Sequence, residues 1–224
     1  MAEGARASWG FYMFTSVDEW SAVANGAQPD WEPRSRIIAK LIRATDSVLD
    51  IGAGNRKLSR FIPPSCKYTP VDCVADLPGT FVVDFNKEFR LPDVDFNVIV
   101  CAGFLEYLDD VPAFFRELAK QAPGRQIVFT YIFGANKKAR TKMKVHNDYG
   151  NSHEFLAAVE GSLSYLDVFA YDRRQGIYNA TLGEGGGPVS RQPIGNILEP
   201  REPRIVKLLR KWGRSIKKRL PAKP

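Results

Sequence analysis

Residues 47–55 read Ser-Val-Leu-Asp-Ile-Gly-Ala-Gly-Asn, a short apolar run that leads directly into a glycine turn. The glycines at positions 52 and 54 allow a tight turn and the close approach of a ligand, because no Cβ stands in the way. Residues 56–62 are expected to form a helix whose first backbone N–H groups face that ligand. The stretch therefore predicts a strand, turn and helix that together form a nucleotide-binding corner.

The residues around this turn separate two classes of cofactor. A dinucleotide fingerprint needs a third small residue, but the chain has Lys57 at that position. The stretch Asp50-Ile51-Gly52-Ala53-Gly54 instead resembles the first motif of class I S-adenosylmethionine-dependent methyltransferases. In that family the acid orders the loop and faces the cationic methionine end of the cofactor. The resemblance thus implies that Asp50, Gly52, Ala53 and Gly54 bind S-adenosylmethionine.

An acid at the end of the second predicted strand fits the same cofactor. The run 67–71 is strand-like and is followed by Asp72, twenty residues after Gly52. A carboxylate at this distance, at the tip of the second strand, can accept hydrogen bonds from both ribose hydroxyls. Asp72 is therefore the expected ribose-binding residue.

The residues that follow two further predicted strands also resemble the family's motifs, and they occur in the same order along the chain. Asp84 and Phe85 close a short strand at 81–83, and the resemblance implies that the acid binds the adenine amino group while Phe85 packs on the ring. The apolar run 97–102 is typical of a strand buried on both faces. The resemblance implies that the backbone at Ala102 and Gly103 passes close to the cofactor.

The rest of the core alternates between helical and strand-like segments. Asp110 before Pro112 predicts the start of a helix, and the β-branched and aromatic residues at 126–133 predict a fifth strand. The other expected segments are helices at 34–43 and 152–160 and a hairpin of strands at 166–171 and 177–182. We therefore expect an α/β fold with a Rossmann-like, mostly parallel sheet of seven strands. The sheet ends in an antiparallel hairpin, as in the methyltransferase family, and helices cover both faces.

The resemblance covers about residues 31–182 and is closest to the small bacterial methyltransferases of the methionine-biosynthesis W-type and glycan-modifying groups. With the composition of the flanking segments, four parts are expected: an aromatic-rich N-terminal arm (1–30), a methyltransferase domain (31–183), a Gly/Pro-rich linker (184–203) and a basic amphipathic tail (204–224). The chain has 224 residues, which suits one α/β domain with appendages. The cysteines, Cys66, Cys73 and Cys101, form no Cys-x-x-Cys pair and are expected as reduced thiols in a cytoplasmic protein.

The positive charge of the chain is concentrated at its C-terminus. Residues 201–224 hold ten Lys or Arg and one acid, a net charge of +9, which leaves −2 for residues 1–200. A nucleic-acid-binding core is therefore not expected. Six large apolar residues recur every three or four positions in 204–220, among them Trp212, and Lys and Arg fill the other faces. This pattern favours contact with an anionic membrane surface, here the inner face, or with an acidic partner. Docking on the domain itself or on a partner subunit and disorder remain alternatives.

The sequence gives fewer indications of the residues at the acceptor site. His146 lies in the polar loop 145–150 and is a candidate base, and Tyr131 on the fifth strand is a second candidate catalytic residue. His153 is expected at the surface. Glu106 and Tyr107 follow the fourth strand, where many relatives have Glu-His. There is no evident acidic triad for a metal, so we expect none.

The sequence leaves three functions open. The leading interpretation is methyl transfer to an oxygen of a small molecule or glycan, and transfer to a nitrogen is less favoured. If the tail binds a membrane, the acceptor is expected to be lipid-linked. No Asn-Pro-Pro-Tyr type of motif is present, which argues against methylation of nucleic-acid bases. The alternatives are a methyltransferase-like binding or scaffold protein without turnover and, less favoured, an NAD-dependent oxidoreductase. The oligomeric state is unknown from the sequence.

Overall fold

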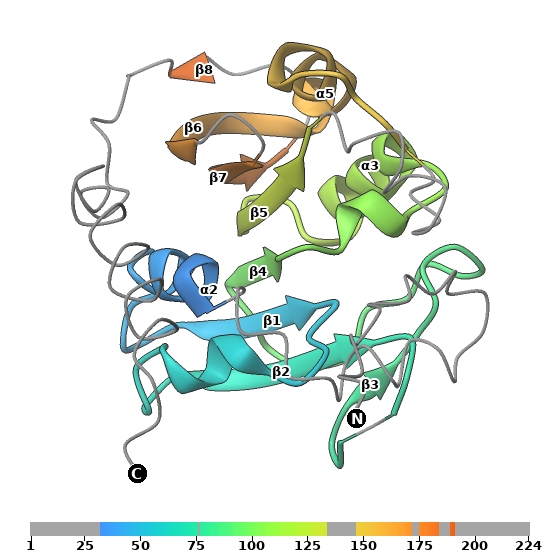
Figure 1. Cartoon of the computed structure of the whole chain (residues 1–224). Helices are drawn as coiled ribbons and strands as arrows, with labels where there is room; N and C mark the ends of the chain where they lie inside the picture. Colours follow the sequence, from blue (N-terminus) through green and yellow to red (C-terminus); the bar gives the residue numbers. More distant parts are fainter. Residues whose placement is uncertain (1–31, 76, 134–146, 172–174, 184–188, 191–224) are drawn as a thin grey trace, which may run out of the picture. The chain divides into compact units, whose positions relative to one another are not determined.

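The computed structural model describes residues 32–75, 77–133, 147–171, 175–183 and 189–190 (Figure 1). Within these residues, eight strands form one sheet in the order β3-β2-β1-β4-β5-β7-β6-β8. Strands β3, β2, β1, β4 and β5 run parallel to one another, whereas β7 is antiparallel to both β5 and β6. The strands are β1 (Ser47–Ile51), β2 (Lys67–Asp72), β3 (Phe81–Val82), β4 (Val98–Cys101), β5 (Gln126–Ile132), β6 (Leu163–Tyr171), β7 (Gln175–Leu182) and β8 (Val189–Ser190).

Helices cover both faces of this sheet, and alternate strand residues point to opposite faces (Figure 1). Leu49 of β1 lies in the core cluster that includes buried residues of α3 (Val111–Gln121) and α5 (Ser152–Val159). Val48 lies in the other cluster, with residues of α2 (Glu32–Ala39) and the short 3-10 helix η2 (Lys57–Arg60). The side chain of Asp50 has the same parity as that of Val48, so it points to the α2 face.

The predicted fold class is confirmed, with two differences at the edges of the domain. The described part of the sheet has eight strands where the sequence predicts seven, because the two residues of β8 pair with β6 in parallel. These residues fall in the segment 184–203 that the sequence indicates as a linker. Helix α2 spans Glu32–Ala39, beginning two residues before and ending four residues before the predicted range 34–43.

The local signals for the other elements agree with the structure. All four residues of β4 are buried, as expected for a strand covered on both faces. Asp110 is the N-cap of α3, and its side chain accepts a hydrogen bond of 2.8 Å from the Ala113 backbone N–H. Two further 3-10 turns occur in the described residues, η3 (Leu105–Tyr107) and η4 (Glu160–Ser162). No helix among the described residues is long and apolar enough to span a membrane.

Candidate functional site

The predicted cofactor residues meet where the parallel strands β1, β2 and β4 end. The backbone N–H groups of Gly52 and Ala53 donate to the Val71 carbonyl of β2, at 2.9 and 3.1 Å. The Gly54 N–H donates to Asp72 Oδ2 at 2.8 Å. These bonds hold the glycine loop against the carboxyl end of β2. The site thus occupies the edge of the sheet at which open α/β folds bind their ligands.

The two glycines of the loop are required for different reasons. Gly52 has φ +74°, and a Cβ there would lie 2.7 Å from Phe104 Cβ. Gly54 has φ +49°, and a Cβ there would have no heavy atom within 4 Å. Both conformations are left-handed, which favours glycine over other residues. The open space at Gly54 is room in which a ligand could lie against the backbone.

The helix predicted at 56–62 is wrong. The chain makes only the four-residue 3-10 helix η2 there, preceded by Arg56 in the left-handed conformation with φ 56°. Pro63 and Pro64 follow directly, and a residue that precedes proline is disfavoured in the α conformation. A left-handed residue on one side and two prolines on the other leave no room for an α-helix.

The side chain of Arg56 holds the end of the glycine loop in place, as a helix would otherwise do. Its guanidinium Nη2 donates to the carbonyls of Leu77 and Pro78, at 3.0 and 2.6 Å, and to Thr80 Oγ1 at 2.7 Å. These three acceptors belong to the loop between β2 and β3. The residue after the glycine turn is thereby tied to the loop that leads to the predicted adenine-binding strand.

Asp50 is a buried carboxylate with few neutralising partners. Its Oδ2 accepts a hydrogen bond of 2.5 Å from the Tyr68 hydroxyl. Burial raises the pKa of Asp50 from 3.8 to about 7, with Asp72 adding to the rise, while the Tyr68 hydrogen bond and the charge of Arg34 oppose it. A carboxylate that is poorly solvated and still titrates near neutral pH is well suited to bind a cationic group.

Asp84 and Phe85 lie next to Asp72 because the Val83 N–H donates to the Asp72 carbonyl at 2.9 Å. Asp84 accepts the Asn86 N–H at 3.1 Å and forms an ion pair of 3.0 Å with Lys87. Phe85 is only partly buried, and its ring makes edge-to-face contacts with three phenylalanines of the core, Phe89, Phe104 and Phe114. Both residues therefore lie on the expected side of the sheet, and their contact with adenine stays a prediction.

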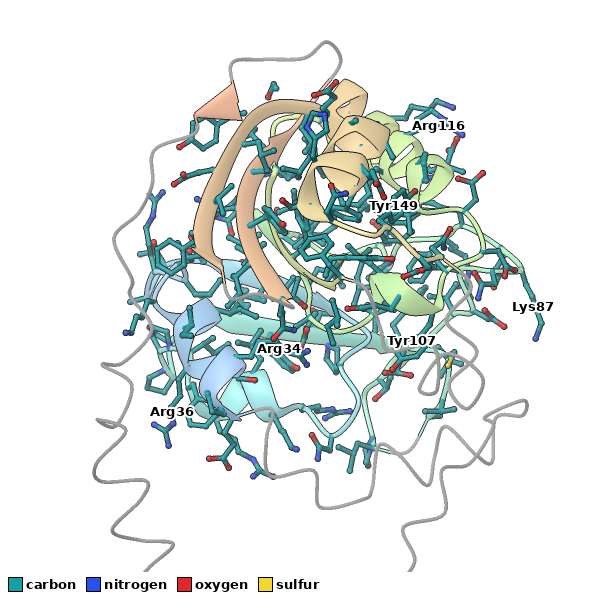
Figure 2. All side chains as sticks on the ribbon, turned by 45° about the horizontal axis from the view of Figure 1, so that its top comes forward. Arg34, Arg36, Lys87, Tyr107, Arg116 and Tyr149 are labelled. Atoms are coloured by element: carbon teal, nitrogen blue, oxygen red, sulfur yellow. The ribbon has the colours of Figure 1, made fainter. Side chains whose placement is uncertain are left out.

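Arg34 lies directly against the predicted backbone site at Ala102 and Gly103. Its Nη2 donates to the Ala102 carbonyl at 3.2 Å. Gly103 has φ +70°, and a Cβ there would be 2.6 Å from Arg34 Nη1. The Gly103 N–H in turn donates to Thr130 Oγ1 of β5 at 2.9 Å. Figure 2 shows Arg34 pointing from α2 toward the sheet, whereas Arg36 of the same helix points away.

The sequence reasoning missed Arg34, although one signal was available. Arg34 precedes Ile38 by four residues, so the two side chains share one face of a helix, and Ile38 is fully buried. An arginine on the buried face of an otherwise amphipathic helix needs partners, and the strand ends supply them.

Glu106 is a buried charged residue beside this backbone. It lies in η3, three residues after Gly103, and its Oε1 accepts the Ile132 N–H at 2.9 Å. Burial raises the pKa of Glu106, against the effect of its hydrogen bonds and of Arg34. Its Oε2 is buried and has no hydrogen-bond partner in the described part of the chain. The neighbouring Tyr107 has its pKa raised by burial first and by Glu106 second.

Tyr131 lies in the core of the domain, and its catalytic role stays a prediction. Its ring is fully buried and stacks on Phe155 with a centroid distance of 4.3 Å. Its hydroxyl donates to the Asn147 carbonyl at 2.8 Å. The ring therefore packs in the core, and its hydroxyl holds the backbone at Asn147. His146 lies outside the described residues, and His153 is exposed, as expected.

No metal-binding group stands out near this edge of the sheet. In the ranges that the structure describes, no three His, Cys, Asp or Glu side chains cluster as ligands for a metal. Cys101 is buried, Cys66 and Cys73 are half-buried, and all three are free thiols. Burial raises the pKa of Cys73 to about 12, with Asp72 adding to the rise, so this thiol stays protonated at neutral pH.

The donor set fits a nucleoside cofactor with a cationic end. Asp72 offers a carboxylate at the tip of β2, Gly54 faces open space, and Asp50 adds a carboxylate behind the loop. The orphaned Oε2 of Glu106 shows that the buried polar groups here are incompletely paired in the described residues. S-adenosylmethionine would bring ribose hydroxyls, an adenine amino group and positive charge to these positions.

Comparison with known proteins identifies the family. Residues 29–161, more than half of the chain, match the family model of a methyltransferase domain. No curated protein matches. The fold is similar to that in the complex of the Haloferax volcanii Trm112 methyltransferase activator with a methyltransferase, at 12% identity and a TM-score of 0.59, covering 77% of this chain and 100% of that chain.

Two further solved structures agree. A SAM-dependent methyltransferase from Aquifex aeolicus is 16% identical with a TM-score of 0.54, and the match covers 75% of this chain and 100% of that chain. Haemonchus contortus phosphoethanolamine N-methyltransferase 2, bound to S-adenosylhomocysteine, is 12% identical with a TM-score of 0.53, covering 75% of this chain and 56% of that chain. The chain therefore belongs to the methyltransferase domain family, as a class I enzyme that uses S-adenosylmethionine.

Proposed function

We propose that the chain transfers a methyl group from S-adenosylmethionine to an oxygen atom of a small molecule or glycan. The observation that carries the cofactor part is the joining of the glycine loop to the tip of β2 through the Gly54–Asp72 hydrogen bond of 2.8 Å. In this proposal Asp72 holds the ribose, Asp84 and Phe85 hold adenine, and Asp50 faces the methionine end. The family assignment leaves no support for the NAD-dependent alternative.

The cofactor, when bound, supplies a methyl group on a sulfonium that is transferred by in-line displacement. The protein therefore has to align the acceptor oxygen with the methyl carbon and exclude water. An alcohol acceptor must also lose its proton, and we assign this task to His146. The assignment is supported by its described neighbour Asn147, whose side-chain amide donates to the Leu108 carbonyl at the end of η3 and whose carbonyl accepts from Tyr131 of β5.

Two features favour a small polar acceptor over a nucleic acid. Residues 1–200 carry a net charge of −2, so the body of the protein has no overall positive charge to attract a nucleic acid. The chain also lacks an Asn-Pro-Pro-Tyr motif for base amines. The second candidate is a protein that binds the cofactor without turnover. It is favoured by the replacement of the usual Glu-His pair by Glu106 and Tyr107.

We also propose that residues 204–220 bind an anionic membrane surface and bring the enzyme to a lipid-linked glycan. These residues lie outside the described part of the structure, and the support is the sequence pattern. Large apolar side chains share one helical face, and basic residues fill the others. Each Lys or Arg near an anionic surface contributes about 1 kcal/mol, which adds to burial of the apolar face. A likeness to the methionine-biosynthesis W-type or glycan-modifying methyltransferases remains part of this proposal.

One labelling experiment tests the proposed reaction. The purified protein is incubated with extract and with S-adenosylmethionine that carries an isotopically labelled methyl group, and the products are separated by mass spectrometry. We expect a labelled product that disappears with Asp72→Ala and whose methyl is bonded to oxygen by NMR. A labelled amine would overturn the oxygen assignment. Tight cofactor binding without any labelled product across extracts would favour the binding protein.

A further inference from the structure

The charges of the described residues are divided between two parts of the domain. Residues 32–75 hold eight Lys or Arg and four acids, whereas residues 77–133 and 147–171 together hold five Lys or Arg and twelve acids. Two of the four acids in the first part, Asp46 and Asp50, are buried, so the surface of that part is strongly basic. A domain whose net charge is small therefore still presents one basic side.

The outer side of α2 forms the first half of this basic surface. Arg36 and Lys40 are exposed and are four residues apart, so their side chains lie on one side of the helix. Figure 2 shows Arg36 pointing away from the sheet. Ile38 and Ile42 are buried and hold the opposite side of the chain against the sheet. Arg43, directly after the last turn, is exposed as well.

The short helix η2 packs against α2 and adds two further basic residues. The guanidinium carbon of Arg36 lies 4.3 Å from the ring centre of Phe61, which is the C-cap of η2. Lys57 and Arg60 belong to η2, and Arg60 is exposed. Burial lowers the pKa of Lys57, and the positive charge of Arg60 lowers it further. The name basic face is used here for Arg36, Lys40, Arg43, Lys57 and Arg60.

Little negative charge from the described residues balances this face. Glu32 lies 4.0 Å from the Arg36 guanidinium, and the two side chains are 46% and 62% exposed, so their ion pair is weak. Within the described ranges, Lys40, Arg43 and Arg60 form no ion pair. Like charges gathered on one surface repel one another, and a bound anionic partner removes this repulsion.

The basic face adjoins the edge of the sheet at which the predicted cofactor residues meet. Helix η2 follows the glycine loop directly. Arg34, on the same helix as Arg36, donates to the Ala102 carbonyl at the end of β4 at 3.2 Å. A partner bound to the basic face would therefore lie beside the cofactor site.

An anionic lipid bilayer fits this face better than a nucleic acid does. The Arg36 guanidinium covers the ring of Phe61, which removes a stacking surface for bases. A bilayer requires only complementary charge from the helix surface. It is also continuous, so it can contact this face and residues 204–220 at the same time, and two weak contacts made together give a much higher affinity.

We propose that the basic face binds the phosphate groups of an anionic lipid bilayer and holds the cofactor edge of the sheet beside that bilayer. This inference rests on the proposed function, since it deepens the membrane contact proposed for residues 204–220. The tail alone would limit only the distance between domain and bilayer, whereas a second contact on the domain also fixes its orientation. The acid-rich remainder of the domain is repelled by anionic lipid, which favours the same orientation.

Vesicle partitioning tests the face with two variants that lose the same charge. The face variant combines Arg36→Gln, Lys40→Gln and Arg43→Gln. The control variant combines Arg116→Gln, Lys120→Gln and Arg125→Gln, which are also two arginines and one lysine, all exposed, on α3 and the turn after it. The full chain is mixed with vesicles of equal parts phosphatidylglycerol and phosphatidylcholine, or of phosphatidylcholine alone. Thermal melting and calorimetry with S-adenosylhomocysteine show whether each variant keeps its fold and its cofactor site.

We expect the face variant to partition about a hundredfold more weakly than the unmodified protein onto the anionic vesicles, because each basic residue near such a surface contributes about fivefold. The control variant should stay within roughly twofold of the unmodified protein, because at about 0.1 M salt charges on the far side are screened over about 10 Å. Neither variant should change the affinity for S-adenosylhomocysteine.

Lysine acetylation of the unmodified full chain, followed by mass spectrometry, shows which side faces the bilayer. Lys40 lies on the basic face, whereas Lys87 and Lys120 lie in the acid-rich part with side chains 79% and 63% exposed. Anionic vesicles should slow the acetylation of Lys40 severalfold and leave the rates of Lys87 and Lys120 unchanged. Vesicles of phosphatidylcholine alone should change none of the three rates.

Equal weakening of partitioning in the face and control variants would overturn the inference, because only the total charge would then matter. An unchanged acetylation rate at Lys40 in the presence of bound vesicles would overturn it as well. Failure of the full chain to bind anionic vesicles would refute the membrane part of the proposed function and this inference with it. Vesicle binding that follows the expected pattern, without binding of S-adenosylhomocysteine, would refute the cofactor function and still support the basic face.

Discussion

Replacement of Asp50 by Asn should make the protein more stable at neutral pH while it damages the cofactor site. The pKa of Asp50 is raised from 3.8 to about 7, a shift of about three units, and each unit corresponds to 1.36 kcal/mol. The ionised carboxylate therefore lowers the free energy of unfolding by about 4 kcal/mol above pH 7. The Asp50→Asn variant carries no charge at this position, and its amide oxygen can still accept a hydrogen bond from Tyr68.

The sign of the pH dependence follows from this shift. Between about pH 4 and 7, Asp50 is protonated in the folded protein but ionised in the unfolded chain. The stability that this proton contributes is therefore full at low pH and is lost as the pH rises through 7. The difference in unfolding free energy between Asp50→Asn and the unmodified protein should accordingly rise by about 4 kcal/mol from pH 4 to pH 8. A constant offset from the buried amide does not change this slope.

Urea unfolding at pH 4, 5, 6, 7 and 8 measures the difference, with exposed Asp93→Asn as the control. Parallel stability profiles for Asp50→Asn and the unmodified protein would refute the reasoning. Cofactor binding gives a second check, because the methionine end is cationic and prefers the ionised acid. The affinity of the unmodified protein for S-adenosylmethionine, divided by that of the variant at the same pH, should increase from pH 6 to 8, because this ratio removes the titration of the ligand's own amino group. The titratable groups that interact with Asp50 are Tyr68, Asp72, Arg34 and the buried thiol of Cys101, and they are the same in both proteins.

Four other predictions concern separate parts of the chain. Asp72→Ala should weaken S-adenosylmethionine binding by roughly 1.5–3 kcal/mol in calorimetry, because the ribose loses a charged acceptor, and an unchanged affinity would contradict the assignment. Arg56→Gly removes three hydrogen bonds but also relieves an arginine of a left-handed conformation, so the two effects should nearly cancel and leave the melting temperature almost unchanged. The same variant should bind methylthioadenosine severalfold more weakly. His146→Ala should abolish turnover on the true acceptor with little change in cofactor affinity, and full turnover across neutral pH would exclude a base at this position. Deletion of residues 201–224 should prevent flotation with anionic vesicles at low salt, and equal flotation of both forms would favour docking or disorder of the tail.

Much of the fold could be predicted because its signals are local. The continuous apolar run of β4 follows from burial on both faces, and the cap at Asp110 follows from the free N–H groups of a helix start. The carboxyl ends of parallel strands lie at one edge, so Asp72 and the glycine loop are expected together, as the Gly54–Asp72 hydrogen bond shows.

The parts that could not be predicted depend on contacts between distant residues. The predicted helix at 56–62 fails because Arg56 adopts a left-handed conformation and bonds to carbonyls more than twenty residues away. Arg34 meets Ala102 across 68 residues of sequence. The burial of Tyr131 depends on its stacking against Phe155, which lies 24 residues further along the chain. Local periodicity carries no information about these partners.

The short η2 turn has an electrostatic consequence for ligand choice. A helix of several turns would direct the positive end of its macrodipole at the glycine loop, with roughly half a unit charge, and would attract phosphate. Four residues of 3-10 helix align too few peptide dipoles to do this. The corner consequently lacks the field that holds a pyrophosphate. A nucleoside without phosphates does not depend on this field for binding, whereas a dinucleotide does. The weak dipole therefore favours binding of a cationic nucleoside cofactor over binding of a dinucleotide.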